Sequence, residues 1–373
     1  MNVLFLLTDG YGNVGGISQF NRDFLAALNA SAAVTRVQAI PRLIPNSIEE
    51  TIPEAVVYDR KAAGNKLRFA WRTLEHARFD PAVNVVICGH IHLLPAAYAV
   101  AWMRQARLVL ILHGVEAWRS RRNWFTLWLI RSVDAFLVVS RLTAERFSSW
   151  SGAPSERFTV LPNCVNLDRF VPQHRDPSLL SRYGLDGCKV ILTVGRLEAK
   201  ERYKGFDEVL EVLPGLVFRF PNLKYLIVGG GEDRSRLAAK AETLGIAKNV
   251  VFTGRIPEEE KVAHFNLAHV YAMPSSGEGF GIVLLEAAAC GIPVIGSSAD
   301  GSREALMGGK LGTLVDPQKP EQLTAALVQA LERDHPRQKP AALDHFGFDQ
   351  FRIRIGQWLQ REAAACSAKQ KVA

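Results

Sequence analysis

The chain has 373 residues, of which 48% are hydrophobic and 22% are charged, and its formal net charge is +8. This composition is typical of a globular protein and excludes a disordered chain, and at roughly 100–200 residues per domain the length predicts about two domains. The five cysteines are scattered, without the spacing of a zinc site or a disulfide framework. We therefore expect reduced thiols and a cytoplasmic protein.

The chain opens with the apolar run NVLFLLT, followed at once by Asp9 and a glycine-rich loop. Because the run lacks a basic start, it predicts a buried first strand rather than a signal peptide. Residues 81–103 carry no formal charge, but Asn84, Gly89 and Pro95 interrupt them. They therefore predict a strand, a loop and a helix rather than a membrane span.

Short β-branched runs alternate with helical segments in two series, which are separated by the polar, proline-containing stretch 161–180. This pattern predicts an α/β protein of two Rossmann-like, doubly wound domains, residues 1–166 and 167–347, each with a parallel sheet. Ligands of such sheets bind beyond the carboxyl ends of the strands. We therefore expect the strand-end loops of both domains to face a central cleft.

A further helix is predicted over residues 348–366. Its apolar side consists of Phe351, Ile355, Trp358 and Leu359. We expect this helix to pack back on the first domain.

The segment GYGNVGG contains the pattern GxGxxG at Gly10, Gly12 and Gly15. A dinucleotide-binding fold needs an acidic residue about 20 positions further on, and the chain has none between Asp23 and Glu49. The loop instead favours backbone amides that meet a phosphate, or a developing negative charge, at the start of a helix. The alternative is a tight turn with no ligand.

His113 ends the apolar run RLVLILHG and is followed by Gly114 and Glu116. A histidine at the carboxyl end of a parallel strand faces the ligand side of the sheet. The alternative is a structural histidine that is hydrogen-bonded within its loop. His90 and His92 end the neighbouring strand in a less specific context.

In the second half, Arg196 follows a strand-like run and Lys204 precedes a helix. Two cations on one loop suit a diphosphate, to which a helix start adds amide donors. The residues between them carry further charges, at Glu198, Lys200, Glu201 and Arg202. A solvated charge cluster is therefore the alternative.

Glycines also follow two later strand-like runs, at Gly229 and Gly230 and at Gly254, which precedes Arg255. Glycine lets the backbone approach a flat ring or a phosphate closely, so we expect Gly229, Gly230 and Arg255 to contact a ligand. Both segments are equally typical of ordinary turns.

The stretch GEGFGIVLLEAAACGIP, residues 277–293, predicts a strand-end turn followed by a helix. Glu278 precedes the helix and Glu286 lies inside it, with seven residues between them. The intervening backbone includes Gly279, Phe280, Gly281 and Ile282. Two carboxylates and helix-start amides predict a sugar at Glu278, a diphosphate at the amides and a ribose diol at Glu286. The alternative for Glu286 is a charge-paired residue on the helix face.

Together these motifs resemble the retaining glycosyltransferases of family 4, which have the two-domain GT-B fold. The resemblance covers most of the chain and is strongest over residues 188–316. It implies that Arg196 and Lys204 bind the donor diphosphate, that Glu278 holds the donor hexose, and that Glu286 binds the nucleotide ribose.

The resemblance also implies that the backbone of Phe280, Gly281 and Ile282 cradles the sugar phosphate. It places His113 beside the transferred sugar, and the loop at Gly15 and Gly16 against donor and acceptor. We expect the amide of Gly279 to contribute to the same donor site.

The implied reaction moves a hexose from a nucleotide diphosphate sugar, GDP-mannose or a UDP-sugar, to the hydroxyl of a saccharide or of a polyprenyl- or lipid-linked acceptor. We expect no cofactor, and no metal because no DxD-type acid pair stands beside the donor motifs. Retention then implies a front-face route with the leaving phosphate as base. One departure from the family is the insertion AKERY before Lys204, which leaves Lys200 or Arg202 as substitutes for it.

The segment around residues 116–131 mixes aromatic and basic residues, which are Trp118, Arg119, Arg121, Arg122, Trp124, Phe125, Trp128 and Arg131. This mixture suits an anionic membrane surface and predicts a peripheral protein at the inner face of the membrane. The alternative is that the tryptophans form core. Nucleic acid is not an expected partner, because no nucleic-acid motif accompanies the basic residues.

Three other functions remain open. A sugar-nucleotide 2-epimerase shares the fold and would convert the donor without an acceptor. A non-catalytic nucleotide-sugar sensor is disfavoured by the intact Glu278, Arg196 and Lys204. A dehydrogenase is disfavoured by the missing acid after Gly15.

Overall fold

The structure is a computed structural model that describes residues 1–48, 50–79, 82–120, 123–333 and 337–372, without the side chains of residues 367–372. The chain folds into two compact units. The N-terminal unit comprises Met1–Cys164 and Phe348–Ala373, and the C-terminal unit comprises Val165–Gly347.

A parallel sheet with the order β3-β2-β1-β4-β5-β6-β7 forms the centre of the N-terminal unit. Its strands are β1 (Asn2–Leu7), β2 (Arg36–Pro41), β3 (Val56–Tyr58), β4 (Val83–Cys88), β5 (Arg107–Leu112), β6 (Ala135–Val138) and β7 (Phe158–Val160). They are nearly continuous apolar runs because both faces of the sheet are covered by helices.

Side chains of β1 alternate between these two faces. Leu4 and Leu6 join a cluster with helices on one face, which are α2 (Lys66–Phe79), α3 (Leu94–Arg104), α5 (Trp124–Arg131) and α6 (Arg141–Ser151). On the other face, Phe5 packs edge-on against Phe24 of α1 (Gly16–Asn29). The helices of the unit are α1 (Gly16–Asn29), α2 (Lys66–Phe79), α3 (Leu94–Arg104), α4 (Val115–Trp118), α5 (Trp124–Arg131), α6 (Arg141–Ser151) and α14 (Phe348–Val372), with the 3-10 turns η1 (Arg60–Ala62), η2 (Ile91–Leu93) and η3 (Ser155–Arg157).

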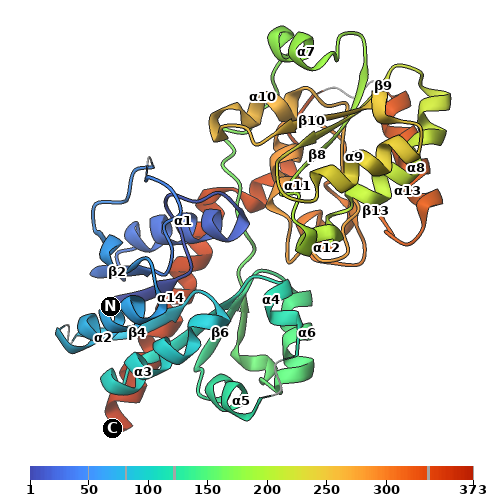
Figure 1. Ribbon diagram of the computed structural model, residues 1–373. Coiled ribbons are helices and arrows are strands. Elements are labelled where there is room, and N and C mark those ends of the chain that lie inside the picture. Colours follow the sequence, from blue (N-terminus) through green and yellow to red (C-terminus); the bar gives the residue numbers. More distant parts are fainter. Residues whose placement is uncertain (49, 80–81, 121–122, 334–336, 373) are drawn as a thin grey trace. The chain divides into compact units, whose positions relative to one another are not determined.

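Helix α14 returns from the end of the chain to lie beside α1 (Figure 1). Its buried side consists of Phe351, Ile355, Trp358 and Leu359. The ring of Phe351 contacts Phe20, and the ring of Trp358 contacts Phe24, with centroids 5.9 and 6.0 Å apart. The N-terminal unit is therefore completed by a segment that is distant in sequence.

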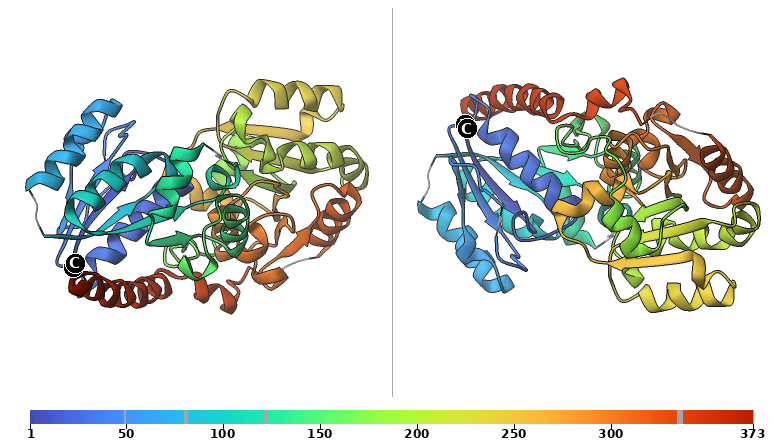
Figure 2. Two further views of the ribbon diagram at one scale, coloured as in Figure 1. Left: turned by 90° about the horizontal axis from the view of Figure 1, so that it is seen from below. Right: turned by 90° about the horizontal axis from the view of Figure 1, so that it is seen from above.

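A second parallel sheet, with the order β10-β9-β8-β11-β12-β13, forms the centre of the C-terminal unit. Its strands are β8 (Lys189–Val194), β9 (Leu223–Val228), β10 (Val250–Gly254), β11 (Val270–Met273), β12 (Val294–Ser297) and β13 (Thr313–Val315). Helices α8 (Phe206–Arg219), α9 (Arg234–Thr243) and α13 (Pro320–Glu332) bury one face. On the other face, Leu284 of α11 (Ile282–Ala289) and Leu306 pack over Gly296. Figure 2 shows these helices in layers about the sheet.

The helices of the C-terminal unit are α7 (Pro177–Tyr183), α8 (Phe206–Arg219), α9 (Arg234–Thr243), α10 (Lys261–Asn266), α11 (Ile282–Ala289), α12 (Ser302–Ala305) and α13 (Pro320–Glu332). The 3-10 turns are η4 (Ala199–Lys204), η5 (Ala247–Asn249), η6 (Glu258–Glu260), η7 (Met307–Gly309) and η8 (Ala341–Phe346).

The apolar stretch that ends at Met103 forms β4, the turn η2 and helix α3 over its described residues, 82–103. The expected strand, loop and helix are thereby confirmed. Across the described chain, no helix combines the length and the apolar character that crossing a membrane requires.

Candidate functional site

The candidate residues of the C-terminal unit gather at the carboxyl edge of its sheet. Arg196 follows β8, Gly229 and Gly230 follow β9, and Arg255 follows β10. The turn with Glu278 follows β11. Parallel strands end at one edge, which is where doubly wound folds bind ligands.

The turn that carries Glu278 is held in place by hydrogen bonds to Asp300, which follows β12. One carboxylate oxygen of Asp300 accepts hydrogen bonds from the backbone amide of Glu278, at 2.8 Å, and from the Ser275 hydroxyl, at 2.7 Å. The amide of Gly301 donates to the Glu278 carbonyl at 2.9 Å. Burial raises the pKa of Asp300 to about 6 despite these hydrogen bonds. The local sequence pattern of Asp300 does not predict this role, because nothing in it shows that Asp300 lies under another loop.

Lys204 lies against Glu278. Its Nζ donates to Oε1 of Glu278 at 2.9 Å and lies 3.6 Å from Oε2 of Glu201. Burial alone would lower the pKa of Lys204, but the charges of Glu278 and Glu201 outweigh it and raise the pKa. Lys204 is therefore a cation held ready at the turn.

Arg196 is more exposed and forms an ion pair with Glu201. The two possible substitutes for Lys204 lie elsewhere: Arg202 pairs with Asp233 at 3.1 Å, and Lys200 is exposed. The structure therefore brings Arg196 and Lys204 together through the Glu201 carboxylate. Of the three cations Lys200, Arg202 and Lys204, it places Lys204 against Glu278.

Helix α11 begins directly after the Glu278 turn. Gly281 precedes it with φ 90°, a conformation that favours glycine. Among the described residues, the amides of Phe280, Gly281 and Ile282 have no hydrogen-bond acceptor. Phe280 itself is buried against Phe346. Gly279 lies so close to Gly301 that a Cβ added at Gly301 would be 2.1 Å from the Gly279 carbonyl oxygen. The result is a fixed row of free N–H donors at a helix start.

Glu286 lies in the fifth position of α11 and is buried. Its Oε1 accepts a hydrogen bond from Lys261 at 2.8 Å, whereas its Oε2 is buried without a hydrogen-bond partner in the described chain. Burial raises the pKa of Glu286, and the charge of Lys261 opposes that rise. Lys261 is thus the partner that the apolar sequence around Glu286 did not reveal. A buried acceptor without a donor is costly, and a ligand hydroxyl would satisfy it.

The glycines after β9 have a different role in the structure. Gly229 has φ 139°, and a Cβ there would lie 1.9 Å from the carbonyl oxygen of Gly195. The close approach at Gly229 is therefore to the protein's own backbone. Gly230 lies beside the side chain of Arg255, which is exposed and forms no ion pair with any described residue.

In the N-terminal unit, His113 follows β5 and is fixed by its loop. Its Nε2 donates to the Gly89 carbonyl at 3.0 Å, and its backbone amide donates to the Glu116 carboxylate at 2.6 Å. Burial lowers the pKa of His113 against the opposing charge of Glu116. Since a carbonyl only accepts, the neutral ring carries its proton on Nε2, and Nδ1 is an acceptor with no partner among the described residues.

The glycine loop before α1 is held by Arg22, a contact that the sequence pattern does not predict. Its guanidinium donates to the carbonyls of Gly10, at 2.7 Å, and Asn13, at 2.9 Å. Gly15 caps α1 with φ 146°, and Gly16 is the first helical residue. A Cβ added at Gly15 would have no described heavy atom within 4 Å. The loop therefore has a fixed base and an open end at the helix start.

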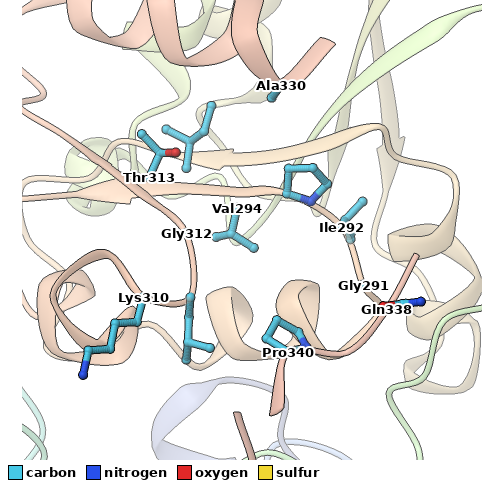
Figure 3. Close-up of a pocket in the computed structure, with 12 residues that line it drawn as sticks. Gly291, Ile292, Val294, Lys310, Gly312, Thr313, Ala330, Gln338 and Pro340 are labelled. Carbon is cyan, nitrogen blue, oxygen red and sulfur yellow. The ribbon is translucent and has the colours of Figure 1, made fainter. Parts of the chain in front are cut away.

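A cavity of about 280 Å³ in the C-terminal unit lies away from these residues. It is lined around the starts of β12 and β13, by Ile292, Val294, Lys310 and Thr313 among others (Figure 3). None of the candidate residues lines it, and it lies at the amino ends of the strands rather than at the carboxyl edge.

Comparison with known proteins identifies the family. The model of Glycosyltransferase Family 4 matches residues 14–169, and that of Glycosyl transferases group 1 matches residues 182–343. The chain is 37% identical over 279 residues to a GDP-mannose-dependent alpha-(1-6)-phosphatidylinositol monomannoside mannosyltransferase of Mycolicibacterium smegmatis, covering 69% of this chain and 68% of that protein. This chain belongs to glycosyltransferase family 4.

The glycosyltransferase is also 37% identical over 219 residues to a D-inositol 3-phosphate glycosyltransferase of Corynebacterium urealyticum, with 56% of this chain and 51% of that protein covered. Among solved structures, Anabaena HepE in complex with UDP matches with a TM-score of 0.74 at 18% identity, over 97% of this chain and 100% of that one. The GT-B fold and the family resemblance are thereby confirmed.

Proposed function

We propose that this glycosyltransferase moves a hexose from GDP-mannose or a UDP-sugar, with retention, to the hydroxyl of a saccharide or lipid-linked acceptor. The observation that carries the proposal is the arrangement around α11. A Lys204–Glu278 pair precedes the helix, free amides start it, and the unpartnered Oε2 of Glu286 lies within it.

Each part suits one part of a nucleotide diphosphate sugar. Arg196, Lys204 and the free amides bind the diphosphate, and they stabilise the negative charge that grows on it as the glycosidic bond breaks. Glu286 accepts a ribose hydroxyl, and Glu278 accepts hydroxyls of the hexose. The acceptor hydroxyl attacks from the side that the diphosphate leaves, and a departing phosphate oxygen takes its proton.

For the remaining candidates, we propose that Gly279, Gly230 and Arg255 line the donor site and that Gly229 shapes it. In the N-terminal unit, Nδ1 of His113 accepts a hydrogen bond from a saccharide hydroxyl. Gly15 and Gly16 contact the same saccharide. The relative from Mycolicibacterium smegmatis supports GDP-mannose as the first donor to test.

A lipid-linked acceptor agrees with exposed aromatic residues on α5. Trp124 is 79% exposed, and Phe125 and Trp128 are each 43% exposed. Trp118 differs, because it donates to Thr143 at 3.3 Å and packs under the guanidinium of Arg146, so it belongs to the packed interior. Arg131 is exposed at the end of α5, and Arg119 is exposed directly after α4. We propose that the exposed aromatic residues of α5 meet an anionic membrane at the inner leaflet. Arg121 and Arg122, predicted to contribute, lie outside the described residues.

The membrane proposal has a direct test. Trp124→Ser and Trp128→Ser together should weaken sedimentation with phosphatidylglycerol vesicles. The matched control is Phe218→Ser, which removes an aromatic side chain that is 92% exposed on the C-terminal unit. Equal losses in both variants would contradict a specific membrane face.

The proposed reaction is tested with radiolabelled GDP-mannose, UDP-glucose and UDP-galactose and a bacterial lipid extract as acceptor. We expect label in the lipid fraction with one donor and none with Glu278→Gln. The anomeric configuration of the product, read by NMR, tests retention. Conversion of the donor without an acceptor would instead indicate an epimerase.

A further inference from the structure

The segment inserted before Lys204 is fastened to the donor site on two sides. The carbonyl of Tyr203 accepts a hydrogen bond from the amide of Ser276 at 2.8 Å. The Tyr203 ring lies so close to Gly277 that a Cβ there would meet it at 2.6 Å. On the other side, Arg202 forms an ion pair with Asp233 at 3.1 Å. These contacts fix the backbone of the segment directly after Glu201.

Glu201 lies at a kink of the turn η4, where its backbone leaves helical geometry. Its side chain is 15% exposed. One oxygen contacts the guanidinium of Arg196, and the other lies 3.6 Å from Nζ of Lys204. That second oxygen is buried and accepts no hydrogen bond from any described residue. One carboxylate therefore spans the two cations that we assign to the donor diphosphate.

We propose that Glu201 is an internal competitor of the donor diphosphate: it occupies Arg196 and Lys204 while the site is empty and must give way when the donor binds. This inference rests on the proposed function. Carboxylate and phosphate oxygens accept the same charge-assisted hydrogen bonds from arginine and lysine, so they compete for the same donors. A carboxylate left beside a bound diphosphate also repels it.

Glu201 differs in this respect from Glu278, which also pairs with Lys204. Glu278 contacts only one of the two cations, and its backbone is locked by Asp300 and Gly301. Glu201 contacts both, through a side chain whose second oxygen accepts no hydrogen bond within the described part of the chain. Competition by Glu201 therefore weakens donor binding and speeds release of the nucleoside diphosphate product.

Isothermal titration of GDP and UDP into the wild-type chain, Glu201→Gln and Glu198→Gln tests the inference. Glu198→Gln removes the same charge from the same segment at a residue with no ion pair to any described residue. We expect Glu201→Gln to bind the recognised diphosphate about two- to fivefold more tightly, the range of a partly exposed ion pair, and Glu198→Gln to bind as wild type. The affinity for the matching nucleoside, guanosine or uridine, should not change.

A second variant guards against misfolding. Glu201→Asp keeps the charge but withdraws it by one methylene, and it should give a smaller gain in the same direction. The inference is overturned if wild type binds the diphosphate and folded Glu201→Gln and Glu201→Asp bind it equally or more weakly. Glu201 would then serve to position the two cations. If neither diphosphate binds to any of the proteins, the proposed function fails together with the inference.

Discussion

Nζ of Lys204 lies 2.9 Å from Oε1 of Glu278, so the cation assigned to the donor phosphate and the carboxylate assigned to the donor hexose are already in contact. The two residues are 74 positions apart and lie on the connections that follow two neighbouring strands, β8 and β11. This contact joins the phosphate and sugar ends of the proposed site. The turn beneath Glu278 is fixed by Asp300, so the pair is held before any ligand arrives.

Replacing Glu278 by alanine should separate sugar recognition from nucleotide recognition. We expect hexose transfer to fall by about 100-fold or more, because hydroxyl contacts that strengthen in the transition state are lost. The affinity for the free nucleoside diphosphate should not fall, because Glu278 is assigned to the hexose and Lys204 and the helix-start amides remain. Titration of nucleotide and nucleotide sugar in parallel measures both effects. Near-normal turnover would contradict the assignment of Glu278.

Replacing Lys204 by alanine should weaken nucleoside diphosphate binding by about tenfold or more, the value of a hydrogen bond to a charged group. Lys200→Ala is the matched control, since Lys200 is an exposed lysine of the same segment. Its affinity should equal that of wild type. A larger loss in Lys200→Ala than in Lys204→Ala would mean that the inserted segment rearranges when the donor binds.

The affinity for nucleotide should fall as the pH falls, and Glu286 should be the cause. Burial raises the pKa of Glu286, and only the ionised carboxylate accepts two hydroxyl hydrogen bonds well. Ligand binding therefore favours the ionised form, and affinity is lost as the pH drops through the raised pKa. Lys204 has a raised pKa and stays charged throughout.

Titrations from about pH 8 to about pH 5 check this dependence. Glu286→Gln should bind more weakly at neutral pH and should show a flatter pH profile than wild type. An equal slope in wild type and variant would assign the pH dependence to another group.

Gly229→Ala should destabilise the fold by about 2 kcal/mol or more, because the new Cβ overlaps the Gly195 carbonyl at a positive φ. Gly215→Ala is the control: Gly215 lies inside α8 with no heavy atom within 4 Å of a built Cβ, and alanine there should stabilise by about 0.5–1 kcal/mol. Urea unfolding of both variants measures the difference. An unchanged stability of Gly229→Ala would show that the backbone has room to move, and would favour a ligand as the reason for the glycine.

The fold class could be predicted because parallel sheets are buried on both faces, so their sequences show continuous apolar runs that alternate with helical segments. Helix α14 could be predicted in the same way from the spacing of Phe351, Ile355, Trp358 and Leu359. Glu278 could be singled out because it lies between a strand end and a helix start, and Lys204 because it precedes a helix on the loop that begins at Arg196.

Other parts of the site leave no local pattern. Lys261 pairs with Glu286 across 25 positions, and Asp300 supports Glu278 across 22 positions. Both contacts depend on which loops the strand order brings together, and a single charged residue on a loop does not reveal its partner. Glu201 was hidden differently, because it lies in a run of charges that is equally typical of a solvated surface.

The central claim is that the C-terminal unit binds a nucleotide diphosphate sugar through α11 and the turn before it. Thermal unfolding of wild type and Glu286→Ala with UDP, GDP, ADP and their sugars at millimolar concentration tests it most directly. We predict that one nucleotide family stabilises the wild-type chain and that the shift is lost in Glu286→Ala. No shift with any nucleotide, or equal shifts in both proteins, would contradict the claim.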